Sequence, residues 1–137
     1  MAQNKVDLPQ PNTSYERRPN LGAGFMMGPD DLITPDRASA AECLYSDCDA
    51  ETIAWASARL GPQPLLTLQE APKAVAWQSK TSTYVVCTND MAVHPDLQRI
   101  MARRCSSVVE WPTDHSPFLC RPDLAAGLLA GLATSPM

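Results

Sequence analysis

The 137-residue sequence has no excess of basic residues and no long apolar run, and each absence excludes a class of protein. Eleven Lys and Arg against fifteen Asp and Glu leave a formal net charge of −4, so there is no basic excess with which to bind nucleic acid. The longest apolar stretch, residues 125–133, is far shorter than the roughly 20 residues that a membrane-spanning helix needs. Hydrophobic residues still make up 45% of the chain, which is enough to build a core. We therefore expect a soluble domain that binds neither nucleic acid nor membrane.

The chain also lacks the sequence signals of export and of zinc ribbons. Its first residues, MAQNKVDLPQPN, contain no apolar core of a secretory signal, and its cysteines form no C-x-x-C pair. Their odd number, five, fits a reducing cytoplasm in which cysteine is a small buried hydrophobe. We therefore expect a cytoplasmic protein with reduced cysteines. They stand at positions 43, 48, 87, 105 and 120.

Proline is plentiful, and the thirteen prolines are about twice the usual share. Residues 1–29 hold several of them, are polar and Gly-rich, and show neither helical nor strand periodicity. This composition predicts an irregular N-terminal arm over 1–29.

Residues 30–71 carry two helix-start signals. The tripeptide Thr-Pro-Asp that opens 34–45 combines an N-cap, a proline at the first helical position and an acid in the first turn, which predicts a helix over that range. Asp47 and Asp49 offer caps for a second helix, which ends at Leu60 before Gly and Pro. Two short helices joined by a tight turn predict a helical hairpin.

Residues 72–137 alternate between strand and helix patterns. The run over 82–88 is rich in β-branched residues and nearly continuously apolar, which is typical of a strand buried on both faces of a parallel sheet. A helix over 95–104, a short strand over 107–111 and a Leu-rich helix over 122–132 follow. Strand, helix, strand and helix with short links predict a right-handed β-α-β-α unit, so the fold class is α/β with parallel strands.

Two titratable residues follow the two predicted strands. Asp90 stands just after the first strand and His115 just after the second, and ligands gather at the carboxyl ends of parallel strands. A carboxylate beside an imidazole is the orienting half of a nucleophilic triad, in which the imidazole takes the proton of the nucleophile. The alternatives are that Asp90 is only a turn residue and His115 a structural histidine. Cys87, Asp90 and His94 also crowd one strand end, but zinc needs a fourth ligand and a more regular spacing, so we expect no metal site.

The motifs around these residues resemble a known family. TYVVCTND over 83–90, VHPDLQR over 93–99 and DHSPFL over 114–119 occur in this order before a Leu-rich helix. They resemble the C-terminal part of the α/β-hydrolase fold, nearest to the esterase branch with the plant methyl esterases, the hydroxynitrile lyases and bacterial relatives. The resemblance implies that Asp90 is the triad acid and His115 the triad base. It also implies that residues 30–71 are the helical lid and 72–137 the C-terminal β-α-β-α part of the core.

One departure limits what the resemblance implies. The family places its nucleophile in G-x-S-x-G on a strained strand-to-helix turn. No serine or cysteine of this chain has glycine two residues away on both sides. Triad order puts the nucleophile before the acid, so the expectation is a lid plus the last two strands, without the half of the sheet that carries the nucleophile.

The resemblance therefore implies a carboxylic-ester hydrolase for which this chain supplies two of three catalytic groups. It implies a small-molecule ester substrate if an N-terminal half completes the site, and no cofactor. The alternative from another class is a truncated, non-catalytic remnant or an interaction module. A third reading within the family is a lyase that acts on cyanohydrins with His115 as base. Because the strand over 83–88 reads as an interior strand without its neighbour, self-association through an exposed strand edge is also expected.

Overall fold

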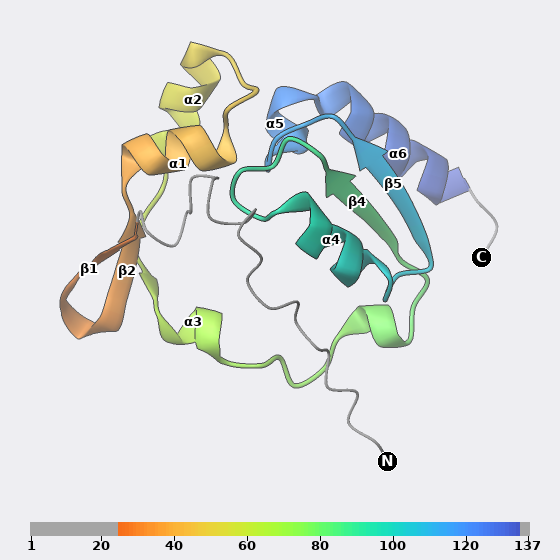
Figure 1. Ribbon diagram of the computed structural model, residues 1–137, viewed down its shortest axis with the longest axis horizontal. Helices are drawn as coiled ribbons and strands as arrows, with labels where there is room; N and C mark the ends of the chain where they lie inside the picture. Colours follow the sequence, from red (N-terminus) through yellow and green to blue (C-terminus); the bar gives the residue numbers. More distant parts are fainter. Residues whose placement is uncertain (1–24, 135–137) are drawn as a thin grey trace.

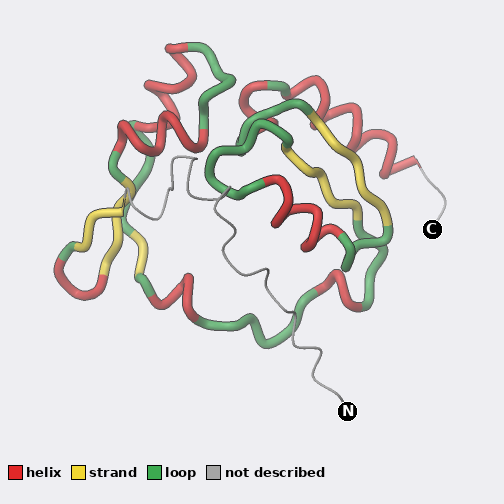
Figure 2. Tube along the Cα trace, viewed as in Figure 1, coloured by secondary structure: helices red, strands yellow, loops and turns green. Residues whose placement is uncertain are grey.

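The computed structural model describes residues 25–134, and residues 1–24 and 135–137 lie outside the described part (Figure 1). Two groups of elements are present. Residues 25–71 form the first, called the lid segment below after the role that the resemblance implies for residues 30–71, and residues 72–134 form the second, called the β-α-β-α segment. Figure 2 shows that each group has strands of its own, and the strand order confirms this separation: β1-β2-β3 in one sheet and β4-β5 in the other.

The β-α-β-α segment contains the parallel pair that the sequence predicts. Strand β4 (Thr83–Cys87) pairs in parallel with β5 (Ser107–Trp111), from Thr83 opposite Ser107 to Cys87 opposite Trp111. Helix α4 (Pro95–Ala102) connects them and packs on β4. Val86 and Cys87 of β4 and Ala102 of α4 are buried, as expected for a strand that is covered on both faces. The prediction of an α/β fold with parallel strands is confirmed.

The end of this segment differs in one respect from the prediction. A short helix α5 (Pro117–Cys120), which the sequence analysis missed, precedes α6 (Pro122–Thr134) and contacts it. A four-residue turn of helix is too short to show an apolar period. Helix α6 begins at Pro122 as predicted, but none of its residues is buried.

The lid segment contains the predicted helical hairpin, with shorter helices. Helix α1 (Arg37–Leu44) begins after Asp36, whose carboxylate accepts a hydrogen bond from the Ser39 amide, so the cap is two residues later than predicted. Helix α2 (Ala50–Ser57) begins after Asp49, one of the two predicted caps, and ends before Leu60. A carboxylate in the cap position satisfies amides that the first turn leaves unpaired, which explains why these two acids decide where the helices begin.

A small antiparallel sheet in this region was not predicted. Strand β1 (Phe25–Met27) pairs with β2 (Leu32–Pro35), which pairs with β3 (Gln63–Pro64). The prediction of an irregular arm is therefore wrong for its last residues, whereas 1–24 lie outside the described residues. The strands are too short to show alternation in the sequence, and β3 joins β2 from a distant part of the chain. The tight turn from β1 to β2 includes Asp30 and Asp31, both with positive φ.

The remaining elements are short. Helix α3 (Leu66–Gln69) and the 3-10 turn η4 (Ala76–Gln78) follow β3, and the turn η3 (Pro29–Asp31) joins β1 to β2. Among residues 25–134, no helix has the length and apolar character needed to cross a membrane.

Candidate active site

The loops after β4 and β5 are held together by an extension of the parallel ladder. The Thr88 amide donates to the Trp111 carbonyl at 2.8 Å and the Asn89 amide to the Thr113 carbonyl at 3.0 Å. These bonds carry the register of the sheet two residues beyond the strands. Asp90 and His115 therefore leave the sheet at the same edge, as the sequence predicts for the carboxyl ends of parallel strands.

The side chains of Asp90 and His115 face each other. His115 Nδ1 lies 2.9 Å from Asp90 Oδ2, within hydrogen-bond distance. The carboxylate is buried, with 3% of its side chain exposed, whereas 39% of the imidazole is exposed. The predicted geometry of the pair is confirmed: a buried acid holds a histidine whose ring is open to solvent.

The Asp90 carboxylate is fixed by further donors. Its Oδ1 accepts hydrogen bonds from the amides of Ala92 at 2.7 Å and Val93 at 2.9 Å. Asp90 thus forms the Asp turn that the alternative interpretation proposed, and it binds His115 at the same time. Hydrogen bonds to a carboxylate favour its charged form, so the turn and the contact with His115 are compatible.

Gln98 is a site residue that the sequence analysis did not identify. This buried residue of α4 donates from Nε2 to Asp90 Oδ2 at 2.7 Å and to the Val93 carbonyl at 2.8 Å. Its Oε1 accepts the Cys87 amide at 2.9 Å. Gln98 therefore links the end of β4 to the carboxylate that faces His115. The only sequence signal was a polar residue among the apolar positions of an amphipathic helix.

The contact with Asp90 changes the acid–base behaviour of His115. The hydrogen bond that His115 donates to Asp90, together with the negative charges of Asp90 and Asp114, raises the pKa of His115, and burial opposes this effect. When Nδ1 carries the proton that it donates to Asp90, Nε2 carries the lone pair. No residue in the described part of the chain bonds Nε2, which is the atom that a triad histidine presents to its nucleophile.

Asp114, the residue before His115, is a second acid that the sequence analysis did not single out. Its side chain is fully buried, and its Oδ1 accepts the Ser116 amide at 2.9 Å. Its Oδ2 accepts the Asp47 amide of the lid segment at 3.0 Å. Asp114 therefore joins the loop of His115 to the loop between α1 and α2.

A disulfide reinforces the same junction and corrects the prediction of reduced cysteines. Cys48, in the loop before α2, is bonded to Cys120 at the end of α5, and their Cα atoms are 4.7 Å apart. The two residues are 72 positions apart in the sequence, and the pairing of distant cysteines cannot be read from their spacing. The expectation of small buried thiols describes Cys43 and Cys87, which are free and buried.

The residues considered as metal ligands do not gather into one site. His94 caps α4, where its Nδ1 accepts the Asp96 amide at 3.2 Å. Among the described residues, the group of candidate ligand atoms that lie close together is that of Cys48, Asp114 and Cys120, and the two cysteine sulfurs of this group are bonded to each other in a disulfide.

Comparison with known proteins decides the family. A model of the alpha/beta hydrolase family matches residues 4–127, which is most of the chain. The chain belongs to the alpha/beta hydrolase family. Its resemblance to this family, read from short motifs, is confirmed, and the fold agrees with it.

This alpha/beta hydrolase chain is similar to one protein in sequence and to solved structures in fold. The protein "Alpha/beta hydrolase nvfD" of Aspergillus novofumigatus (strain IBT 16806) is 31% identical over 101 residues, which are 72% of this chain and 40% of the relative. Crystal structures of polyneuridine aldehyde esterase and of a mutant of it match with TM-scores of 0.64 and 0.63 at 18% identity. The two matches cover 80% and 79% of this chain, but only 47% and 46% of the esterase chains. This chain therefore spans less than half the length of these proteins.

Proposed function

We propose that this alpha/beta hydrolase chain provides the acid and the base of a carboxylic-ester hydrolase. The observation that carries the proposal is the hydrogen bond between His115 Nδ1 and the buried Asp90 carboxylate, with 39% of the His115 side chain exposed. The family and the esterase fold of the structural neighbours support the reaction class.

The chemistry assigns one role to each side chain. His115 Nε2 takes the proton of a serine hydroxyl as the serine attacks the ester carbonyl, and later returns it to the leaving alcohol. Asp90 keeps the proton of His115 on Nδ1 and stabilises the imidazolium that forms. Gln98 holds the carboxylate in place through its bond to Oδ2 and is a positioning residue.

We propose that the serine comes from a segment outside these 137 residues, because none of their serines lies in G-x-S-x-G. A segment with that turn would add the nucleophile and an oxyanion hole. We accordingly propose a small-molecule ester as substrate, bound once such a segment completes the site.

The test measures hydrolysis of p-nitrophenyl acetate by the chain alone and mixed with a fragment of a related hydrolase that carries the G-x-S-x-G turn. Loss of the nucleophile costs about 10⁶-fold in kcat, so the chain alone should show no turnover. The mixture should show turnover that His115→Ala abolishes and His94→Ala retains. Burst kinetics of the chain alone that disappear in His115→Ala would sink the assignment of a missing serine.

If the chain binds the fragment but the mixture remains inactive, the result favours the alternative, a non-catalytic remnant or interaction module. The cyanohydrin-lyase reading is distinguished by the product, because it releases a carbonyl compound and cyanide without an acyl-enzyme. Trapping an acyl-serine in the mixture would therefore exclude it.

A further inference from the structure

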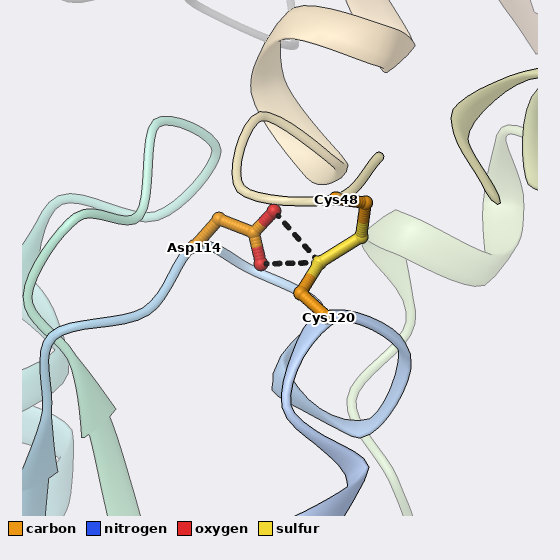
Figure 3. Close-up of side chains that lie close together, drawn as sticks. All are labelled: Cys48, Asp114 and Cys120. Carbon is orange, nitrogen blue, oxygen red and sulfur yellow. Dashed lines mark hydrogen bonds between the residues drawn. A yellow bond between two sulfur atoms is a disulfide. The ribbon is translucent and has the colours of Figure 1, made fainter. Parts of the chain in front are cut away.

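A second cluster of reactive side chains lies beside the pair of Asp90 and His115. Figure 3 shows the disulfide of Cys48 and Cys120 with the Asp114 carboxylate against it. Cys48 belongs to the lid segment, and Asp114 immediately precedes His115. The disulfide therefore joins the lid segment covalently to the chain segment that carries the candidate base.

The Asp114 carboxylate is placed for proton transfer to and from one of the sulfurs. Its two oxygens lie 3.4 and 3.5 Å from Cys120 Sγ. A disulfide sulfur has no proton, so this contact becomes a hydrogen bond only when Cys120 is a thiol. The carboxylate is buried and also accepts a hydrogen bond from the amide of Asp47 in the lid segment. The same group therefore contacts the Cys120 sulfur and holds the loop between α1 and α2.

We propose that Cys48 and Cys120 form a reversible thiol–disulfide site that fastens the lid segment beside His115, with Asp114 as its proton acceptor. In the oxidising direction, the thiolate of Cys48 attacks a small-molecule disulfide, forms a mixed disulfide and releases one thiolate of the reagent. Cys120 then attacks the Cys48 sulfur, its proton passes to Asp114, and the second reagent thiolate leaves and takes that proton from Asp114. The protein dithiol loses two electrons to the reagent disulfide, and the first reagent thiolate takes from water the proton that Cys48 gave to water when it became a thiolate.

The surroundings of the bond suit a small reagent. Cys48 and Cys120 are both partly exposed, and an open pocket of about 330 Å³ lies next to them. Their chain neighbours Asp49 and Leu119 line it, together with Glu51, Thr52 and Trp55. Two acids on its wall disfavour anionic thiols, so a neutral pair, 2-hydroxyethyl disulfide and dithiothreitol, is the appropriate probe.

The first experiment counts free thiols of the full chain under denaturing conditions. Dithiothreitol should give all five thiols, and 2-hydroxyethyl disulfide should reduce the number to the three of Cys43, Cys87 and Cys105. A peptide map should join Cys48 to Cys120, also in the matched control Cys105→Ser. Five thiols after oxidation, or a different pairing, would overturn the proposal whatever happens with the variants.

The second experiment measures the rate of disulfide closure in Asp114→Asn. General-base assistance is worth at least about tenfold at a positioned group, so closure should slow by that factor or more. Asp47→Asn is the control, since it removes a neighbouring acid but keeps the backbone bond to Asp114. An unchanged rate in folded Asp114→Asn rules out the carboxylate as the proton acceptor.

The third experiment asks whether the bond fastens the lid segment. Trypsin cleavage after the exposed Arg59 should be several-fold faster in the reduced chain than in the oxidised chain, and Cys48→Ser should behave as reduced in both conditions. Equal cleavage in the two states contradicts the fastening. Any effect of the disulfide on ester hydrolysis rests on the proposed function, whereas the thiol counts and the trypsin cleavage do not. A chain that is inactive toward esters but has a reversible disulfide would therefore refute the proposed function and leave the thiol–disulfide site standing.

Discussion

At the scale of single residues, the site depends on how the Asp90 carboxylate shares its two oxygens. Oδ1 accepts two amides of its own turn, and Oδ2 receives both Gln98 and His115. The turn and Gln98 hold the carboxylate against the sheet edge without using the imidazole. His115 therefore meets an acid that is already oriented, which is the arrangement a general base needs.

Replacing Asp90 by Asn should lower the pKa of His115. The hydrogen bond from His115 to Asp90 is the main cause that raises this pKa above its ordinary value of 6.5, so its loss moves the pKa down toward that value or below it. Titration of the imidazole proton resonances by NMR measures the change, with His94 as internal reference. A His115 pKa that stays in place in Asp90→Asn contradicts the contact.

The same shift sets a pH dependence of stability. Because the pKa of His115 is higher in the folded chain than in the unfolded one, its contribution is fully present below about pH 6.5 and is lost as pH rises through the folded value. In Asp90→Asn this part of the dependence should disappear, which urea unfolding at several pH values can show.

Replacing Gln98 by Leu should destabilise the chain by about 2–3 kcal/mol, because buried groups at the end of β4 lose their partner. The Cys87 amide and the Val93 carbonyl both bond this side chain. Loss of the donor to Oδ2 also leaves more negative charge beside His115, so its pKa should rise. Urea unfolding and NMR titration measure the two effects, and Gln78→Leu at an exposed position is the control. A Gln98→Leu variant as stable as that control would contradict the role given to Gln98.

At the scale of elements, helix caps and one covalent bond arrange the lid segment. Asp49 rather than Asp47 caps α2, since the Asp49 carboxylate accepts the Thr52 amide at 2.7 Å. The Asp47 amide instead bonds Asp114, and the disulfide follows at the next residue. The loop between the two helices is thus held by the segment of His115 and not by its own helices alone.

Asp49→Ala should lower the unfolding temperature at pH 7, whereas Asp47→Ala should not. Hydrogen bonds from Thr52 lower the pKa of Asp49, so its contribution is present above the unfolded value and is lost as pH falls through the lower folded value. The difference between the variants should therefore persist at pH 5 and fade below about pH 3.8. Thermal unfolding of both variants, followed by circular dichroism at each of these pH values, measures the difference. Equal unfolding temperatures of the two variants at pH 7 would show that the cap is unimportant.

At the scale of the whole molecule, apolar surface is left uncovered within residues 25–134. Strand β4 pairs with β5 alone in its described sheet, and α6 buries none of its residues. Phe118, Leu129 and Leu132 expose 63%, 66% and 47% of their surface. A two-stranded sheet and an apolar helix without buried residues are surfaces that other chain segments cover in larger sheets.

We expect the chain to self-associate at micromolar concentration through this surface. Leu129→Lys with Leu132→Lys should reduce the association, because each places a charge where an apolar contact forms. Light scattering after size exclusion measures the mass, and Glu51→Lys on the lid segment is the control for a mere change of net charge. A monodisperse wild-type monomer would contradict the expectation.

The parallel strands, their connecting helix and the meeting of Asp90 with His115 could all be predicted from the amino-acid sequence. These features follow from local periodicity and from one topological rule, that parallel strands end at the same edge of a sheet. The short motifs added the family, which the matches to known proteins confirm.

The small sheet at residues 25–64, the disulfide and the roles of Gln98 and Asp114 emerged only from the packing of the folded chain. Each joins residues that are distant in sequence or belong to different elements, and their spacing carries no signal of the pairing. A polar residue on a helix or a cysteine in a loop acquires its partner only when packing brings another segment within bonding distance. For this reason the pair at the strand ends could be predicted, whereas the groups that hold it and join it to the lid segment could not.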